Sequence, residues 1–293
     1  MTDMRIRAPV VAGQFYPAGR DGCLEEVRAC LASRRVSEPL PASIVGGLVP
    51  HAGWTFSGDL AAMVFAAIKK QRPAVQTFLI FGTAHSYFGG LPAVDDNGAW
   101  QTPLGDIAID TALRDALLRA GVVTTDNQAH QYEHSIEVQV PFVQHLFPEA
   151  RIVPVVVPPV ETAIALGEKA GELAGDPGRT VVCIGSTDLT HYGPRSGFTP
   201  MGKGSDGLQW ASEVNDRQFI DLAVSLDAQR LLATAIEKGN ACGPGAAAAL
   251  VATARKLGVA KGQLLAYITS NDVMQAKTGS TARDSVGYAA IVF

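Results

Sequence analysis

The sequence predicts an α/β protein with a central mixed or mostly parallel β-sheet that is flanked by helices. Apolar, β-rich runs alternate along the chain with amphipathic or Ala-rich segments, and this order is typical of strands connected by helices. The chain has 293 residues, of which 47% are hydrophobic and 18% charged. A chain of this length can bury roughly 75% of the surface that it exposes when unfolded. This length fits either one large α/β domain or two ordinary ones, and we expect a single domain over residues 1–293 because no linker-like segment divides the chain.

The strands are predicted where short apolar runs lie between turn-forming residues. Such runs occur early, in the middle and at the end of the chain, and the last two would complete the sheet. The expected strands are Ser43–Val49, Thr77–Gly82, Ile152–Val157, Thr180–Gly185, Gln263–Thr269 and Ser285–Val292.

The helices are predicted where apolar residues recur at helical spacing. In the first of them Leu60, Val64 and Ile68 share one face, and Ser57 is placed to cap the helix. The expected helices are Ser57–Lys70, Asp110–Ala120, Ser135–Leu146, Glu161–Ala174, Ala211–Leu222, Asp227–Lys238 and Pro244–Leu257. The segment Gly193–Gly207 is rich in Gly, Ser and Pro, so we predict a surface loop near the functional site there.

Composition argues against several classes of function. The net charge is -4 and the isoelectric point is near 5.9, with no run of like charges, so nothing indicates binding to nucleic acid or to an anionic membrane. The most apolar segment, Ile152–Val160, is short and contains three prolines, which argues against a membrane span. The four cysteines form no CxxC pair, which favours a reducing cytoplasm over a disulfide scaffold.

Three histidines follow predicted strands. His51, His85 and His191 come after the runs that end near residues 49, 82 and 185. Because ligands of open α/β sheets bind beyond the carboxyl ends of the strands, we expect these imidazoles to converge at one edge. Small neighbours, Ser86 and Ser186 among them, would let a ligand or metal approach closely. Taken singly, a histidine in a loop is more often a surface residue or a hydrogen-bonded structural residue than a ligand.

Acidic residues accompany these histidines. Asp188 and His191 form a D-x-x-H motif that would place both side chains in one pocket if the segment turns helically. A carboxylate beside an imidazole suits a general base or an outer partner of a metal, although Asp188 could instead cap a helical turn. Glu133 and His134 precede a predicted helix, where they could contact substrate or metal ligands, and capping by Glu133 is equally compatible.

Cys242 lies in the sequence NACGPG, directly before an Ala-rich helix. A thiol at a helix N-terminus has a lowered pKa, which would make the thiolate available to a metal or as a nucleophile. Burial as a simple packing residue is the alternative, because free cysteines are often buried.

Taken together, these motifs resemble the Memo-like family, also called AmmeMemoRadiSam system protein B. The matching segments occur in the family's order and span nearly the whole chain. They are AGQFYP at Ala12–Pro17, VPHAGWTFSG at Val49–Gly58, FGTAHS at Phe81–Ser86, TPLG at Thr102–Gly105, EHSIEVQVPF at Glu133–Phe142, STDLTHYG at Ser186–Gly193 and ACGP at Ala241–Pro244.

The resemblance implies a fold similar to that of the class III extradiol dioxygenases, which hold non-haem Fe(II) with two histidines and a carboxylate. By motif position, His51 and His85 correspond to the histidine ligands and His191 to the histidine on the opposite wall of the pocket. Cys242 stands where the dioxygenases have the carboxylate, so ring cleavage does not follow from the resemblance. We expect a divalent metal, Fe(II) first, with Zn or Cu favoured by the thiolate as alternatives.

Three functions are compatible with these residues. The first is a metal-dependent redox enzyme in which His191, oriented by Asp188, moves a proton, and Trp54 and Tyr192 line the substrate pocket with Tyr87. The second is a binding or adaptor protein that holds a small molecule or peptide in the same cleft, and here the family resemblance implies a radical-SAM protein as a candidate partner. The third is a hydrolase with Cys242 as its nucleophile.

Overall fold

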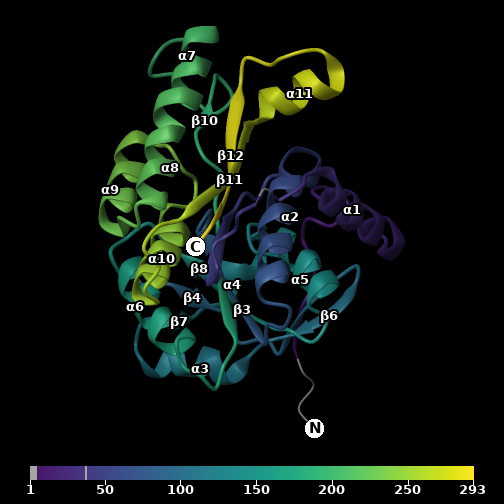
Figure 1. Ribbon diagram of the computed structural model, residues 1–293, viewed down its shortest axis with the longest axis vertical. Coiled ribbons are helices and arrows are strands. Elements are labelled where there is room, and N and C mark those ends of the chain that lie inside the picture. The colour runs from purple at the N-terminus through teal and green to yellow at the C-terminus, as the bar shows by residue number, and fades with distance from the viewer. Residues whose placement is uncertain (1–4, 37) are drawn as a thin grey trace.

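The computed structural model describes residues 5–36 and 38–293 and contains one large mixed β-sheet with helices on both faces (Figure 1). The strands are hydrogen-bonded in the order β10-β12-β2-β9-β3-β8-β4-β7, and β11 pairs with β12. Their bounds are β2 Gly46–Val49, β3 Thr77–Thr83, β4 Ala93–Val94, β7 Thr124–Thr125, β8 Arg151–Val157, β9 Val181–Ser186, β10 His191–Tyr192, β11 Gln263–Thr269 and β12 Ser285–Val292.

The centre of the sheet is parallel and its margins are mostly antiparallel. Neighbours β2, β9, β3 and β8 run in the same direction, with Val49 opposite Ser186 and Thr83 opposite Val157. Strand β12 pairs antiparallel with β2, β10 and β11, and β4 pairs antiparallel with β8. The predicted α/β class with a mixed sheet is therefore confirmed.

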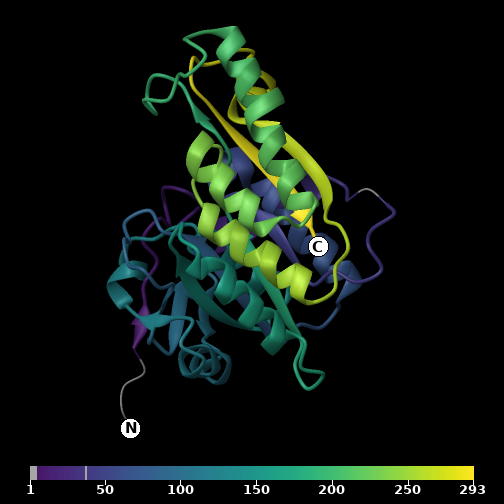
Figure 2. The ribbon, with the colours of Figure 1, turned by 90° about the vertical axis from the view of Figure 1, so that its left-hand side faces the viewer.

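Each face of the sheet carries its own hydrophobic cluster, because side chains alternate along a strand. On β3, Phe78 and Ile80 point to one cluster, whereas Leu79 and Phe81 point to the other. The first cluster includes helices α1 Arg20–Ser33, α2 Trp54–Gln71 and α5 Val140–Leu146. The second includes α3 Thr111–Arg119, α6 Thr162–Ala174, α8 Asp216–Val224, α9 Ala228–Lys238 and α10 Pro244–Lys256, several of which lie in front of the sheet in Figure 2.

Two helix starts differ from the prediction. Helix α2 begins at Trp54 with Gly53 at its N-cap, so Ser57 lies inside the helix and its hydroxyl donates to the Ala52 carbonyl. The predicted helix from Ser135 begins only at residue 137, as a 3₁₀ turn, and α5 follows with Pro141 in its first turn. Pro141 explains this start, because proline is favoured in the first turn of a helix.

Several elements were not predicted. Helix α7, Ser205–Trp210, begins inside the predicted loop Gly193–Gly207 and continues through a π-helical turn, Ala211–Asn215, into α8. Helix α11, Ser270–Thr278, joins β11 to β12, and α7 and α11 project beyond the sheet at the top of Figure 1. The short strands β4, β7 and β10 of the large sheet and helix α4, Asn127–Gln131, were not predicted either. The same holds for β1 Ile6–Arg7, β5 Ala99–Thr102 and β6 Gly105–Ala108, which form a small sheet. None of the helices in the described residues combines the length and apolarity that crossing a membrane requires.

Candidate metal centre

The site lies beyond the carboxyl ends of three neighbouring parallel strands. His51 follows β2, Asp188 follows β9 and His85 follows β3, so one edge of the sheet carries all three side chains. Cys242 reaches the same edge from the turn before α10. Its neighbour Gly243 makes this approach possible, because a Cβ there would lie 2.3 Å from the Thr83 hydroxyl oxygen.

His51, His85 and Cys242 each offer one ligand atom, and these atoms all lie within 4.8 Å of one another. The shortest separation is 3.2 Å, between His51 Nε2 and Cys242 Sγ. His51 is only 2% exposed, whereas the other two side chains are more open to solvent. His51, His85 and Cys242 are therefore neighbours, as their positions after two strands and before a helix predict.

The hydrogen bonds of His51 define its tautomer. Its Nδ1 lies 3.1 Å from the Ser186 hydroxyl oxygen, and that hydroxyl donates its own proton to the Ser135 carbonyl at 2.7 Å. The hydroxyl oxygen must then accept from His51 Nδ1, which leaves Nε2 without a proton. Burial, together with His85, lowers the pKa of His51 to about 3, so this imidazole is neutral at pH 7.

Glu133 orients His85 in the same way. Both carboxylate oxygens of Glu133 lie 3.0 Å from His85 Nδ1, and the carboxylate also accepts from the backbone N–H groups of His85 and Ser135 at 3.2 and 2.7 Å. Burial alone would raise the pKa of Glu133, but these contacts lower it to about 2. A carboxylate at Nδ1 of His85 holds a proton on that nitrogen and leaves Nε2 as the atom that can bind a metal.

Cys242 does not have the lowered pKa that its position in the sequence predicts. Burial and the nearby Asp188 carboxylate raise the pKa of the thiol to about 12. Gly243 is the N-cap of α10, so Cys242 precedes the helix instead of lying in its first turn. The Asp188 N–H points at Sγ from 3.3 Å. A bound divalent cation would stabilise the thiolate, because coordinating thiols lose their proton.

Asp188 and His191 also meet Cys242, although by a different path from the one predicted. The segment between them is extended, not helical, and His191 belongs to strand β10. Asp188, His191 and Cys242 offer ligand atoms within 4.8 Å of one another. Asp188 Oδ1 accepts the backbone N–H of His51 at 2.7 Å, while His191 is exposed to solvent. Desolvation lowers the pKa of His191, and Asp188 opposes that shift.

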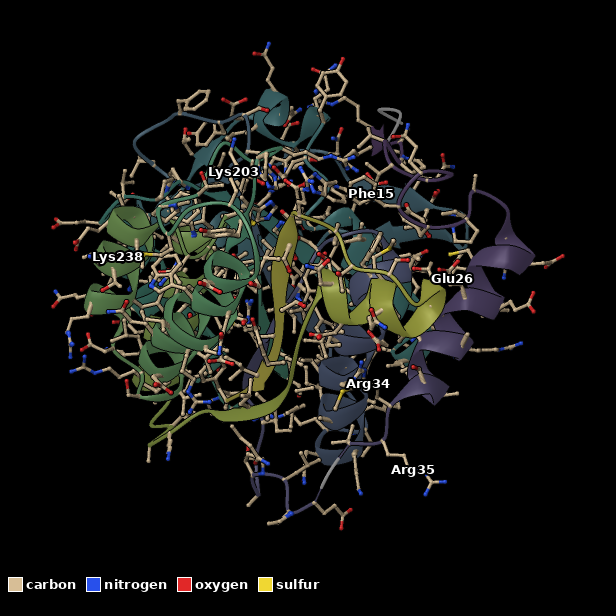
Figure 3. The ribbon with its side chains drawn as sticks, turned by 90° about the horizontal axis from the view of Figure 1, so that it is seen from above. Phe15, Glu26, Arg34, Arg35, Lys203 and Lys238 are labelled. Carbon is tan, nitrogen blue, oxygen red and sulfur yellow. The ribbon has the colours of Figure 1, made fainter. Side chains whose placement is uncertain are left out.

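His134 adds a third imidazole beside His51 and His85. Its ring is stacked on that of His85 with centroids 4.6 Å apart, and it meets the His51 ring edge-on at 5.4 Å. Phe15, labelled in Figure 3, contacts the His134 ring at a centroid distance of 4.8 Å. Burial and His51 lower the pKa of His134 to about 4, so the His134 imidazole is neutral at pH 7.

The remaining predicted residues lie in varied surroundings. Trp54 is 4% exposed, donates to the Val138 carbonyl at 3.0 Å and packs in the hydrophobic core. Tyr192 is 1% exposed, and its hydroxyl donates to the Gly202 carbonyl at 2.7 Å. Ser86 is exposed at the start of the loop after His85.

Sequence reasoning missed two buried polar groups behind the site. Gln139 donates to the Pro50 carbonyl at 2.8 Å and lies 3.3 Å from the Ser186 hydroxyl, so it supports the partner of His51. Asp216, 1% exposed, accepts from the Thr190 N–H at 2.8 Å and from the Tyr267 hydroxyl at 2.6 Å. Gln139 was visible as a polar residue within an apolar run, whereas Asp216 looks like any acid on an amphipathic helix.

Asp216 predicts a distinct pH dependence of stability. Burial raises the pKa of its carboxyl to about 6. A raised pKa stabilises the fold below the unfolded pKa, and this contribution is lost as the pH rises through about 6. The free energy of unfolding of the wild type should therefore fall between pH 4 and pH 7.5. In Asp216→Asn the fall should be smaller by on the order of 2–3 kcal/mol, because the amide does not titrate. Urea unfolding at both pH values measures this, and Asp221→Asn, exposed on the same helix, should behave like the wild type.

Comparison with known proteins gives consistent matches over nearly the whole chain. The family model described as "Memo-like protein" matches residues 7–292. A MEMO1 family protein of Methanopyrus kandleri is 36% identical, with 98% of each chain covered. One of Thermococcus onnurineus is 35% identical over 98% of this chain and 99% of that protein. A solved structure of an uncharacterized Escherichia coli K12 protein has a TM-score of 0.49 and 14% identity, covering 83% of this chain and 99% of that one.

Proposed function

Because this chain belongs to the Memo-like family, we propose that it binds one divalent cation through His51, His85 and Cys242 and uses it in a redox reaction. Fe(II) is the first candidate, as in non-haem iron dioxygenases, and Zn or Cu are alternatives that the thiolate donor favours. The family resemblance supports a redox role for the metal, and the residues of the site support the binding.

The observation that carries this proposal is that hydrogen bonds orient the imidazoles of both His51 and His85 through their Nδ1 atoms. Ser186 holds the Nδ1 proton of His51, Glu133 holds that of His85, and both Nε2 atoms are left with free lone pairs. Cys242 Sγ lies 3.2 Å from the first of these atoms. Two imidazoles and one thiol suit a transition metal, and three protein ligands leave coordination positions open for a small molecule.

The proton-moving group that we propose is His191. It lies at the open mouth of the site, close to Asp188 and Cys242. Burial lowers the pKa of His191 and the Asp188 carboxylate opposes that shift, so Asp188 would stabilise the imidazolium that forms when His191 takes a proton from a substrate. When bound, the metal would supply a Lewis acid and, for iron or copper, a one-electron redox partner. Binding of the substrate next to His191 would then place its acidic proton within reach of the imidazole.

A second function, binding of a small molecule or peptide without turnover, is favoured by exposed aromatic residues close to the site in sequence. Phe88, in the loop after His85, is 93% exposed, and Tyr132, directly before Glu133, is 75% exposed. Contiguous exposed apolar patches mark contact surfaces, and we propose that Phe88 and Tyr132 contribute to one. The other members of the family's named system, including a radical-SAM protein, are the partners that we propose. The free state of all four cysteines supports a location in the cytoplasm.

Metal analysis of protein purified without a histidine tag tests the proposal first. Near one equivalent of iron, followed by O₂ consumption in the presence of a reduced organic substrate, would support the redox function. Bound metal without O₂ consumption, together with a partner that co-purifies through the exposed Phe88 and Tyr132 side chains, would favour the binding function. Protein that neither contains nor takes up a divalent metal would contradict the metal site itself.

Glu133→Gln should weaken metal binding by about 10–100-fold, the usual effect of removing an outer partner of a metal-bound histidine. The Glu133 carboxylate now accepts hydrogen bonds from His85 Nδ1 and the Ser135 N–H, and the NH₂ group of a glutamine would turn its own hydrogens toward one of these donors. Competition with a chromophoric chelator measures the affinity. Glu168→Gln, the same change on the exposed face of α6, should bind metal like the wild type. Equal affinities for both variants would mean that Glu133 does not orient His85.

A further inference from the structure

Two segments on one side of the metal centre are bound directly to each other. The Asp188–His191 segment and the Asn240–Cys242 turn are joined by an antiparallel bridge between Leu189 and Ala241. The Cys242 N–H donates to the Asp188 carbonyl at 3.1 Å, and the Asp188 N–H points back at Cys242 Sγ. The position of the thiol therefore depends on the position of the Asp188–His191 segment.

Both segments are also tied to two consecutive buried residues, Asn215 and Asp216, each 1% exposed. The Asn215 amide donates to the Thr190 hydroxyl at 3.0 Å, and its backbone carbonyl accepts from the Asn240 amide at 3.0 Å. Asp216 Oδ1 accepts the Thr190 N–H at 2.8 Å. The pair thus holds one residue next to His191 and one residue of the turn that ends at Cys242.

Local backbone structure brings the two side chains to the same place. Asn215 ends the π-helical turn Ala211–Asn215, and Asp216 begins α8. Turns of this kind inside helices are rare and are frequent at functional sites. Asp216 is fixed from behind by the Tyr267 hydroxyl at 2.6 Å, and a Cβ on Gly287 would lie 1.9 Å from Asp216 Oδ2. Tyr267 of β11 and Gly287 of β12 therefore lie directly against the Asp216 carboxylate, on the side away from Thr190.

We propose that Asn215 and Asp216 are positioning residues of the metal centre, which hold Thr190 and Asn240 so that Cys242 and His191 keep their separation. This inference rests on the proposed metal site and extends it to residues that touch neither metal nor substrate. The pair acts on the Asp188–His191 segment through Thr190, because Asn215 binds the Thr190 hydroxyl and Asp216 binds its N–H. Loss of the Thr190 hydroxyl should loosen the segment that carries the thiol.

Thr190→Val tests the inference, with Thr253→Val as the matched control. Both threonines are buried, at 1% and 0% exposure, and both lose side-chain hydrogen bonds on substitution, but Thr253 belongs to α10 and its hydroxyl contacts α6. Co(II) titration reports affinity and, through the thiolate-to-metal absorption band, the geometry at Cys242. Alkylation of Cys242 in metal-free protein, followed by peptide mass spectrometry, reports the exposure of the thiol without any metal.

For Thr190→Val we expect Co(II) affinity to fall by about tenfold with a changed absorption band. Alkylation of Cys242 should become about threefold to tenfold faster, the change that one lost hydrogen bond gives to a local opening equilibrium. Thr190→Ser, which keeps the hydroxyl, should restore both, and Thr253→Val should match the wild type. Equal behaviour of Thr190→Val and Thr253→Val in both measurements would overturn the inference. If the wild type takes up no Co(II), the proposed metal function fails, and the alkylation rates still decide whether the pair positions Cys242.

Discussion

Cys242→Ser should weaken metal binding by more than about 100-fold, above the range for outer partners of metal ligands. The thiolate is the only sulfur donor within 4.8 Å of the His51 and His85 ligand atoms, among the groups that the described residues form. A serine hydroxyl does not ionise in a buried site, and it is a poor ligand for the softer metals that thiolate favours. Metal analysis after equilibrium dialysis measures the effect, and Cys30→Ser in α1 should retain the metal.

The same residue should make metal binding strongly dependent on pH. Because burial raises the pKa of the Cys242 thiol to about 12, the protein binds the metal at neutral pH only by releasing that proton. His51, with a pKa of about 3, has no proton to release. Affinity should therefore rise by about tenfold per pH unit between pH 6 and pH 8, with about one proton released per metal. Calorimetry in two buffers of different ionisation enthalpy counts that proton.

A different outcome would move the centre within the same pocket. His85, Glu133 and His134 form a second group whose ligand atoms lie within 4.8 Å of one another. If Cys242→Ser kept full affinity and released no fewer protons, the metal would have to be held on that side, and Glu133 would be a ligand. The hydrogen bonds of the Glu133 carboxylate to His85 and Ser135 argue against this, because binding a metal there would break them.

The convergence of His51 and His85 could be predicted from the sequence for a simple physical reason. Both follow apolar runs that become parallel strands, and the carboxyl ends of parallel strands meet at one edge of a sheet. Cys242 could be added because the NACGPG sequence marks a turn before a helix. That the whole chain forms a single domain stays a prediction.

Other properties of the site depend on contacts that no local pattern contains. The pKa of Cys242 is raised instead of lowered because the fold buries the thiol and places Asp188, distant in sequence, beside it. Asp188 and His191 are three residues apart, a spacing that suits a helical turn, but the bridge from Leu189 to Ala241 holds the segment extended. Asp216 accepts the Thr190 N–H from the first residue of α8, directly after a π-helical turn that no local pattern predicts. Each of these features depends on contacts between segments that are distant in sequence.

Behind Glu133 lies a buried ion pair that links the N-terminal segment to the site. Arg7 and Glu137 are 2.8 Å apart, with side chains 6% and 1% exposed. Arg7 also donates to the Glu133 carbonyl at 2.8 Å, and Glu137 accepts from the Val10 N–H and the Tyr16 hydroxyl at 2.9 Å. The segment that orients His85 is thus held by a charged group that water cannot reach.

Glu137→Gln should therefore destabilise the protein by about 3–5 kcal/mol, since it leaves the buried Arg7 guanidinium without its counter-charge. All partners of the Glu137 carboxylate are hydrogen-bond donors, the Arg7 guanidinium and the Tyr16 hydroxyl among them, so the NH₂ group of a glutamine would find no acceptor there. Urea unfolding of metal-free protein measures the loss, and Glu237→Gln, which breaks an exposed pair with Lys238, should change stability by less than about 1 kcal/mol. Because Arg7 holds the Glu133 carbonyl, the folded variant should also bind metal more weakly than the Glu237 variant. A stable Glu137→Gln protein with unchanged metal affinity would show that the N-terminal segment is held without this pair.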